Sequence, residues 1–155
     1  MPRMFNSKAA KERTIENHLR FYKCYLVGIK NCEKQLDYIM PTLVSRYEVS
    51  TDTGESFWIV NNTEKVALDR IESKRALDLR EEIEQFKLIT ESIEAALKEM
   101  KPEELNFVQH RYFSGLPIQE VKNKMGYSEE KSVYRIRRKV LDKLLISLHN
   151  LLTFK

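Results

Sequence analysis

The sequence predicts an all-α protein with a long N-terminal helical hairpin or coiled-coil element and a C-terminal helix-turn-helix domain. Two observations favour this fold class. Apolar residues recur every three or four positions through much of the chain, and only four glycines and four prolines interrupt its 155 residues. Hydrophobic residues at 42% and charged residues at 32% are typical of a folded chain rather than a disordered one.

The first long helix is predicted from a heptad seam, in which Glu33 takes one of the apolar positions. The apolar members of the seam are Ile15, Leu19, Tyr22, Leu26, Ile29, Leu36, Met40 and Leu43. The period breaks after Pro41, so we expect a central loop over residues 41–62. Within it, "YEVSTDTGESFWIV" has alternating residues on either side of a Thr-Gly turn signal, which fits a small β-hairpin or only a loop.

A second long helix is predicted after Asn62 and Thr63, which are good helix-capping residues, and it should end near Lys101. The same spacing continues through Ala76, Leu79, Ile83, Phe86, Thr90, Ile93, Leu97 and Met100. The two helices, over residues 8–100, could cover each other within one chain or be shared between two chains. A parallel homodimer would set Glu33 against its own copy, which favours the intrachain hairpin and leaves dimerisation through another surface open.

Shorter elements follow over residues 101–155. "PEELNFVQHRYF" begins with a proline and two acids, as helices commonly do, and Gly115 should end this helix. Pro117 opens the next helix, which Gly126 ends. Ser128 then starts a helix without a breaker as far as about Leu152. Three helices of this size with glycine turns outline a helix-turn-helix domain.

The positive charge of the chain is concentrated in this last segment. Residues 1–100 carry 16 basic and 17 acidic side chains, whereas residues 101–155 carry 11 and 6. Six of the basic residues lie between Lys131 and Lys143, where Asp142 is the single acid. Such an asymmetry is expected when one part of a protein meets phosphate and another does not.

The basic residues of the third helix form a coherent face. At 100° per residue, with Val133 as zero, a buried stripe falls within about 60° of Val133, and the cationic residues fall opposite it, between about 100° and 200°. The stripe consists of Val133, Ile136, Val140, Leu144 and Ser147, and the outward face of Lys131, Tyr134, Arg135 and Arg138. Ser132 and Lys139 flank that face, and Gln119 and Lys122 lie on the preceding helix, where backbone phosphates would pass.

A run of Arg and Lys on a helix is most often only a solvated face. Here a glycine turn precedes the helix, the charge excess is confined to it, and an apolar stripe buries its other side, so the combination favours binding of double-stranded DNA. The leucines near the end of the helix occupy a sector wider than one stripe, and either the long hairpin of the same chain or a second copy must cover them. These leucines are Leu144, Leu145, Leu148, Leu151 and Leu152.

Two stretches of this domain resemble the fourth region of bacterial sigma factors, namely "IQEVKNKMGYS" (118–128) and "IRRKVLDKL" (136–144). With "NNTEKVALDRI" (61–71), "RYFSGLPIQEVKNKMGYS" (111–128) and "VYRIRRKVLDKLL" (133–145), the wider pattern is similar to the RinA and ArpU type of bacteriophage late-gene transcription regulators. The resemblance covers about two thirds of the chain, strongly after Pro102 and loosely before it.

This resemblance implies a phage or prophage protein in the bacterial cytoplasm that binds a promoter or operator and activates late genes for packaging, morphogenesis or lysis. By position, Gln119 and Lys122 would contact the DNA backbone, while Lys131, Ser132, Tyr134, Arg135 and Arg138 would form the recognition face. The four residues "EEKS" between Ser128 and Val133 exceed the usual three by one. The extra residue shifts the register of the first turn of the recognition helix relative to the family, but it does not shift Arg135 and Arg138. The aromatic-rich, promoter-melting helix of a full sigma factor has no counterpart, so the resemblance implies assistance at a promoter, with RNA polymerase as a further candidate partner.

Enzymatic, metal-binding and membrane functions find no support in the residues. The three histidines lack a second ligand at helical spacing, the two cysteines form no C-x-x-C pair, and phosphate-binding glycine loops and nucleophile motifs are absent. We therefore expect no enzyme activity, no cofactor and no metal. Without a leader or a long apolar run, we expect a cytoplasmic protein with no membrane contact.

Two rival functions stay open. One is a small packaging subunit, which pairs helix-turn-helix and coiled-coil elements in a ring and would differ from a regulator by forming a closed ring in solution. The other is a protein-interaction module that grips RNA polymerase or a host factor through the hairpin and uses the basic helix only as an electrostatic tether. Binding that depends on DNA sequence would separate a regulator from such a tether.

Overall fold

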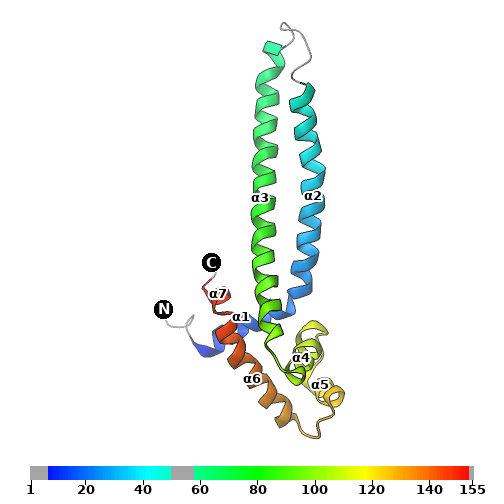
Figure 1. Ribbon diagram of the computed structural model, residues 1–155, viewed down its shortest axis with the longest axis vertical. Coiled ribbons are helices and arrows are strands. Elements are labelled where there is room, and N and C mark those ends of the chain that lie inside the picture. Colours follow the sequence, from blue (N-terminus) through cyan, green and yellow to red (C-terminus); the bar gives the residue numbers. More distant parts are fainter. Residues whose placement is uncertain (1–6, 50–57, 154–155) are drawn as a thin grey trace. The chain divides into compact units, whose positions relative to one another are not determined.

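The structure, a computed structural model, describes residues 7–49 and 58–153, with side chains described at 7–39 and 67–153. Every regular element in these ranges is a helix, which confirms the predicted all-α class (Figure 1). In chain order the elements are α1 (Lys8–Arg20), α2 (Tyr22–Val49), α3 (Trp58–Lys98), α4 (Pro102–Val108), the π-helix η1 (Gln109–Phe113), α5 (Ile118–Met125), α6 (Glu130–Ser147) and α7 (His149–Leu152).

The chain divides into two compact units. One combines Met1–Tyr25 with Leu88–Lys155, and the other is Leu26–Lys87. This division differs from the domain boundary expected between residues 100 and 101, because α1 and the last turns of α3 belong with the C-terminal helices. We call the first the head unit and the second the hairpin unit.

In the hairpin unit, α2 and α3 run side by side in opposite directions (Figure 1). Ile39, Ala76 and Leu79 form a buried cluster to which Cys32 and Leu36 contribute. Both α2 and α3 therefore contribute to this cluster.

The two helices approach closely at Gly28. A Cβ atom added there would lie 3.0 Å from Cε2 of Phe86, so this position favours glycine despite its cost inside a helix. Glu33, which interrupts the apolar seam, lies 3.9 Å from the ammonium group of Lys87 on the facing helix. The side chains of Lys87 and Glu33 are 41% and 48% exposed, and the distance is long, so the pair adds little stability.

The first long helix and the central loop differ from their predictions. The helix begun at Lys8 ends at Arg20, with Phe21 as its C-cap, and a new helix starts at Tyr22. The expected loop over 41–62 is shorter, since α2 continues past Pro41 to Val49 and α3 begins at Trp58. The suggested β-hairpin is therefore wrong at residues 47–49 and 58–60, and its remaining residues, 50–57, lie outside the described ranges.

The core of the head unit joins both ends of the described chain. Its fully buried members include Ile15 and Leu19 of α1, Ile93 of α3, Phe107 of α4 and Leu144 of α6. Helix α1 packs against η1, α6 and α7. The wide leucine sector at the end of α6 is thus covered by the same chain, through α1 and the last turns of α3, both of which lie within the predicted hairpin segment 8–100.

Two further helices depart from the expected outline. The helix predicted over 102–113 ends as a π-helix, where the N–H of Ser114 donates to the carbonyl of Gln109 at 2.9 Å. The last helix was expected to run to Leu152, but α6 ends at Ser147 and the short α7 follows. Leu148 lies between them with φ −106° and ψ 25°, which is outside the α-helical region.

A buried carboxylate fixes α4 against α6. Glu104 is 5% exposed, and both of its oxygens accept hydrogen bonds from Nζ of Lys143 at 2.8 Å. It also accepts a hydrogen bond of 3.3 Å from the backbone N–H of Lys101 at the start of α4. Burial alone would raise the pKa of Glu104, but the hydrogen bonds and charges of Lys143 and Lys101 lower it overall.

This lowered pKa makes the head unit sensitive to acid. Because the folded pKa lies below the unfolded value, the contribution of Glu104 is fully present above the unfolded pKa and is lost as the pH falls through the folded pKa. Glu104→Gln should reduce the free energy of unfolding by about 1–3 kcal/mol at neutral pH and by less in acid. Urea denaturation at several pH values measures both effects. The exposed Glu99→Gln is the control, and equal losses for the two variants at all pH values would contradict the assignment.

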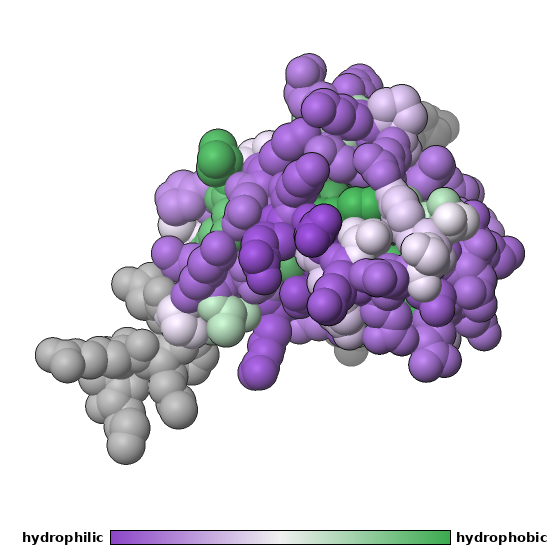
Figure 2. All heavy atoms as spheres, turned by 90° about the horizontal axis from the view of Figure 1, so that it is seen from below, coloured by the Kyte–Doolittle hydropathy of each residue, from purple (hydrophilic) through white to green (hydrophobic). Residues whose placement is uncertain are grey.

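The surface is predominantly polar. Hydrophilic residues cover most of the face seen in Figure 2, and hydrophobic residues occupy smaller areas between them. Among the described residues, none of the helices combines the length and the apolar character needed to cross a lipid bilayer.

Candidate nucleic-acid interface

The candidate site begins with the turn between α5 and α6. Gly126 caps α5 with φ 75°, a left-handed conformation that favours glycine, and its N–H donates to the carbonyl of Asn123. The N–H of Tyr127 donates to the carbonyl of Lys122 at 3.0 Å, and the Tyr127 hydroxyl donates to the carboxylate of Glu103 on α4. These bonds fix where the chain leaves α5 and therefore where α6 begins.

The buried side of α6 anchors it to the rest of the head unit. Val133, Ile136, Val140 and Leu144 are buried, as the apolar spacing predicts. Leu141 is buried as well, while Ser147, which was expected in the stripe, is exposed. Helix α6 packs against α5 and α4 on this side, and Val121 of α5 is fully buried beside it.

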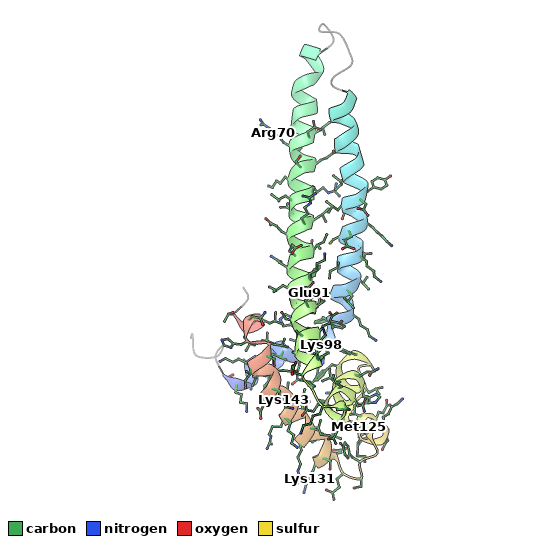
Figure 3. All side chains as sticks on the ribbon, viewed as in Figure 1. Arg70, Glu91, Lys98, Met125, Lys131 and Lys143 are labelled. Atoms are coloured by element: carbon green, nitrogen blue, oxygen red, sulfur yellow. The ribbon has the colours of Figure 1, made fainter. Side chains whose placement is uncertain are left out.

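The opposite side of α6 carries cations without carboxylate partners. Within the part of the chain that the structure describes, no ion pair engages any of the four, Lys131, Arg135, Arg138 and Lys139, and all of them are exposed. Tyr134 lies in the same sector and is 49% exposed. Figure 3 shows Lys131 near the first turn of α6. The predicted recognition face is therefore accessible to solvent.

Two other cations of α6, Arg137 and Lys143, are paired with carboxylates of neighbouring helices. Nη2 of Arg137 lies 2.5 Å from Oε1 of Glu16, and Lys143 binds Glu104. The helix thus separates its positive charge into a paired set on the packed side and an unpaired set on the exposed side. The sequence pattern alone did not reveal this pairing, because Glu16 lies on α1, far away along the chain.

The remaining predicted residues lie around this face. Gln119 on α5 is exposed, whereas Lys122 on α5 and Ser132 in the first turn of α6 are half-buried. Lys124, which the sequence analysis did not single out, is a further exposed cation of α5. Helix α5 therefore exposes one polar side chain, Gln119, and one cationic side chain, Lys124, to solvent.

Charged and nucleophilic residues elsewhere do not assemble a metal site. In residues 7–39 and 67–153, no three of the His, Cys, Asp and Glu side chains lie close enough together to hold a metal ion. Cys24 is exposed and Cys32 is half-buried, and neither forms a disulfide. The unpaired cationic face of α6 is the feature whose chemistry points to a partner.

Comparisons with protein-family models, with curated proteins and with solved structures gave no match for the chain.

Proposed function

We propose that the chain binds double-stranded DNA in a sequence-dependent manner through α5 and α6 and regulates transcription. The observation that supports this proposal is the segregation of charge on α6, with four exposed cations that no carboxylate of the described residues neutralises. One α-helix fits the major groove of B-DNA, and guanidinium groups reach guanine edges or phosphate oxygens.

The short helix and the turn before α6 support the same proposal. The left-handed Gly126 and the packing of Val121 hold α5 and α6 in fixed register, as expected for a helix-turn-helix unit whose second helix enters the groove. Gln119 and Lys122 on α5 would then contact the DNA backbone, together with Ser132 and Lys139. Lys131, Tyr134, Arg135 and Arg138 would face the bases.

The biological role within this proposal comes from the resemblance described above. It would make the protein an activator of bacteriophage late genes in the host cytoplasm, acting beside RNA polymerase and on a promoter or operator. Two copies that bind paired half-sites would increase the affinity, so a homodimer belongs to the same proposal.

Selection of bound duplexes from a random pool, followed by affinity measurements, tests the proposal. Arg135→Ala or Arg138→Ala should weaken binding to the selected sequence by about 1–3 kcal/mol, or roughly 5- to 150-fold, if each arginine contacts a base. Arg70→Ala, an exposed arginine of the hairpin unit, is the matched control. If no sequence is enriched, binding does not depend on the DNA sequence. If the arginine variants lose the same affinity for selected and for random DNA, these arginines contact only phosphates.

A further inference from the structure

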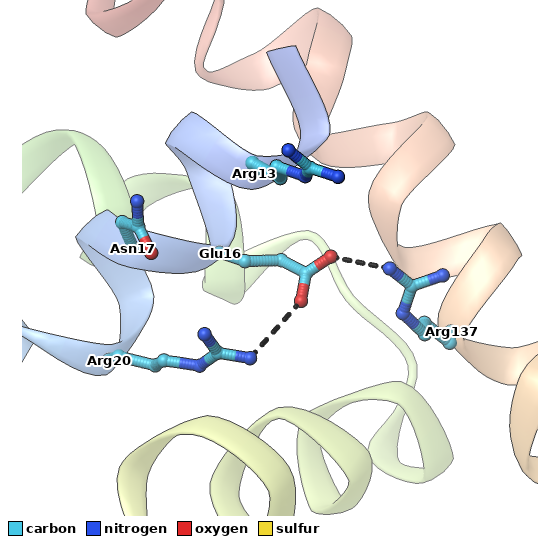
Figure 4. A pocket seen from close by; sticks show the side chains of 5 residues that line it. All are labelled: Arg13, Glu16, Asn17, Arg20 and Arg137. Atoms are coloured by element: carbon cyan, nitrogen blue, oxygen red, sulfur yellow. Dashed lines mark hydrogen bonds and ion pairs between the residues drawn. The ribbon is translucent and has the colours of Figure 1, made fainter. Parts of the chain in front are cut away.

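A recess in the head unit has a chemical character distinct from that of the cationic face. Four residues of α1 and one of α6 line this pocket of about 350 Å³, as Figure 4 shows. They are Arg13, Glu16, Asn17, Arg20 and Arg137. We call this recess the arginine pocket.

The carboxylate of the pocket is shared between two of its three arginines. Oε1 of Glu16 lies 2.5 Å from Nη2 of Arg137, and Oε2 lies 3.5 Å from Nη2 of Arg20. In the described part of the chain, Arg13 has no ion pair. The negative charge of Glu12 also acts on Arg137, and Glu12 shares Lys8, at 4.0 Å, with Asp142, at 3.2 Å, but neither of these carboxylates lines the pocket. The lining therefore carries three positive charges against one negative charge.

Hydrogen-bond donors are also in excess around this cluster. Tyr112 is 2% exposed, and its hydroxyl has no hydrogen-bond partner among the described residues. Tyr112 lies on η1, which packs against α1, the helix that carries four of the five lining residues. Among the described residues, the head unit thus holds a buried, unsatisfied polar group on an element that adjoins the pocket's main helix, and such groups usually have a partner. The side-chain amide of Asn17 adds a donor on the lining itself.

We propose that the arginine pocket binds a small molecule that carries a phosphate group. The surplus of two positive charges matches a phosphate dianion better than a single carboxylate, and guanidinium forks bind phosphate oxygens in pairs. The volume lies near the lower end of small-molecule sites, which are at least about 300 Å³.

The position of the pocket separates it from the proposed DNA face. On α6, Arg137 points towards α1, about 100° or more around the helix from Arg135 and Arg138. A ligand held there would contact both α1 and α6 and strengthen their association. Binding would therefore stabilise the head unit without occupying the cationic face.

Thermal unfolding of the full chain provides the test, with inorganic phosphate and a nucleoside monophosphate as separate probes and chloride at equal ionic strength as the reference. We expect the melting temperature to rise with either probe and to saturate, because a ligand bound only by the folded state stabilises it. If the melting temperature reaches its plateau at a lower concentration of the monophosphate than of inorganic phosphate, a phosphate ester is the preferred ligand. No rise beyond that in chloride for either probe would overturn the proposal, as would displacement of the bound probe by random duplex DNA.

Two variants locate the binding. Arg13→Ala removes an arginine that makes no ion pair, and Asn17→Asp introduces a carboxylate of the same shape that repels an anion. Each should weaken the phosphate response roughly tenfold or more, since one charge-assisted hydrogen bond accounts for about that factor. Arg70→Ala is the control, and circular dichroism checks that every variant is folded. Equal phosphate responses in Asn17→Asp and the control would overturn the assignment to this pocket, even if Arg13→Ala failed to fold.

Discussion

Phe107→Ala is expected to lower the free energy of unfolding by about 3–5 kcal/mol, through lost burial and the cavity left behind. The ring is completely buried in the head unit, in a cluster to which α1, α3, α4, α5 and α6 contribute residues. It also packs edge-on against Tyr112, with ring centroids 5.8 Å apart and planes at 89°, an arrangement that favours aromatic pairs. Urea denaturation followed by circular dichroism measures the loss.

Phe21→Ala provides a control of the same chemistry. The ring of Phe21 is 53% exposed, so its removal should cost about 1 kcal/mol or less. If the two phenylalanine variants unfold at the same urea concentration, Phe107 does not occupy a packed core position.

Leu19→Ala should destabilise the protein by about 2–5 kcal/mol. Leu19 is completely buried in the core of the head unit, although the sequence places it on a helix predicted for the hairpin. Loss of this side chain should therefore weaken the packing of α1 against α6 and α7. Hydrogen exchange measured by mass spectrometry should show faster exchange in α6 and α7 of this variant, while α2 near Ile39 is unaffected.

Leu77→Ala is the matched control for this experiment, because Leu77 is 57% exposed and its loss should change the stability by no more than about 0.5 kcal/mol. Faster exchange in α2 but not in α6 after Leu19→Ala would contradict the division into head and hairpin units.

The sequence pattern predicts most of the helices because their signals are local. Gly115 and Gly126 both adopt positive φ where helices were expected to end, and Pro102 begins a helix as predicted. The buried stripe of α6 follows from the 3.6-residue period, which needs no knowledge of the partner that covers it.

The break at Phe21 could not be predicted in the same way. Leu19 and Tyr22 are three residues apart, which is the spacing expected whether the helix continues or ends between them. Only the packing of α1 against α6, more than a hundred residues later, separates the two cases. At Pro41 the prediction failed in the opposite direction, because the helix was expected to end there but α2 continues to Val49. A proline removes one backbone hydrogen-bond donor from a helix but does not always end it.

The part of the candidate site that lies on α6 alone could be predicted from the sequence. Arg135 and Arg138 share a face because of their spacing, so their exposure follows from the buried stripe. The arginine pocket was not predictable, because it joins Arg13 and Arg20 of α1 to Arg137 across the fold. The helical period already places Arg137 beside the buried stripe and Arg138 opposite it, but nothing in the sequence near Arg137 identifies Glu16 as its partner.

The docking of α1 onto α6 and α7 also bears on how the protein emerges during translation. The ribosome releases α1 first, but its binding partners appear only after α2 and α3 have been synthesised. The helices of the nascent hairpin can pair early, whereas the apolar side of α1 stays exposed until the leucines of α6 and α7 have been synthesised. A chaperone that shields this helix during the delay would therefore raise the yield of native protein more than one that acts on the hairpin.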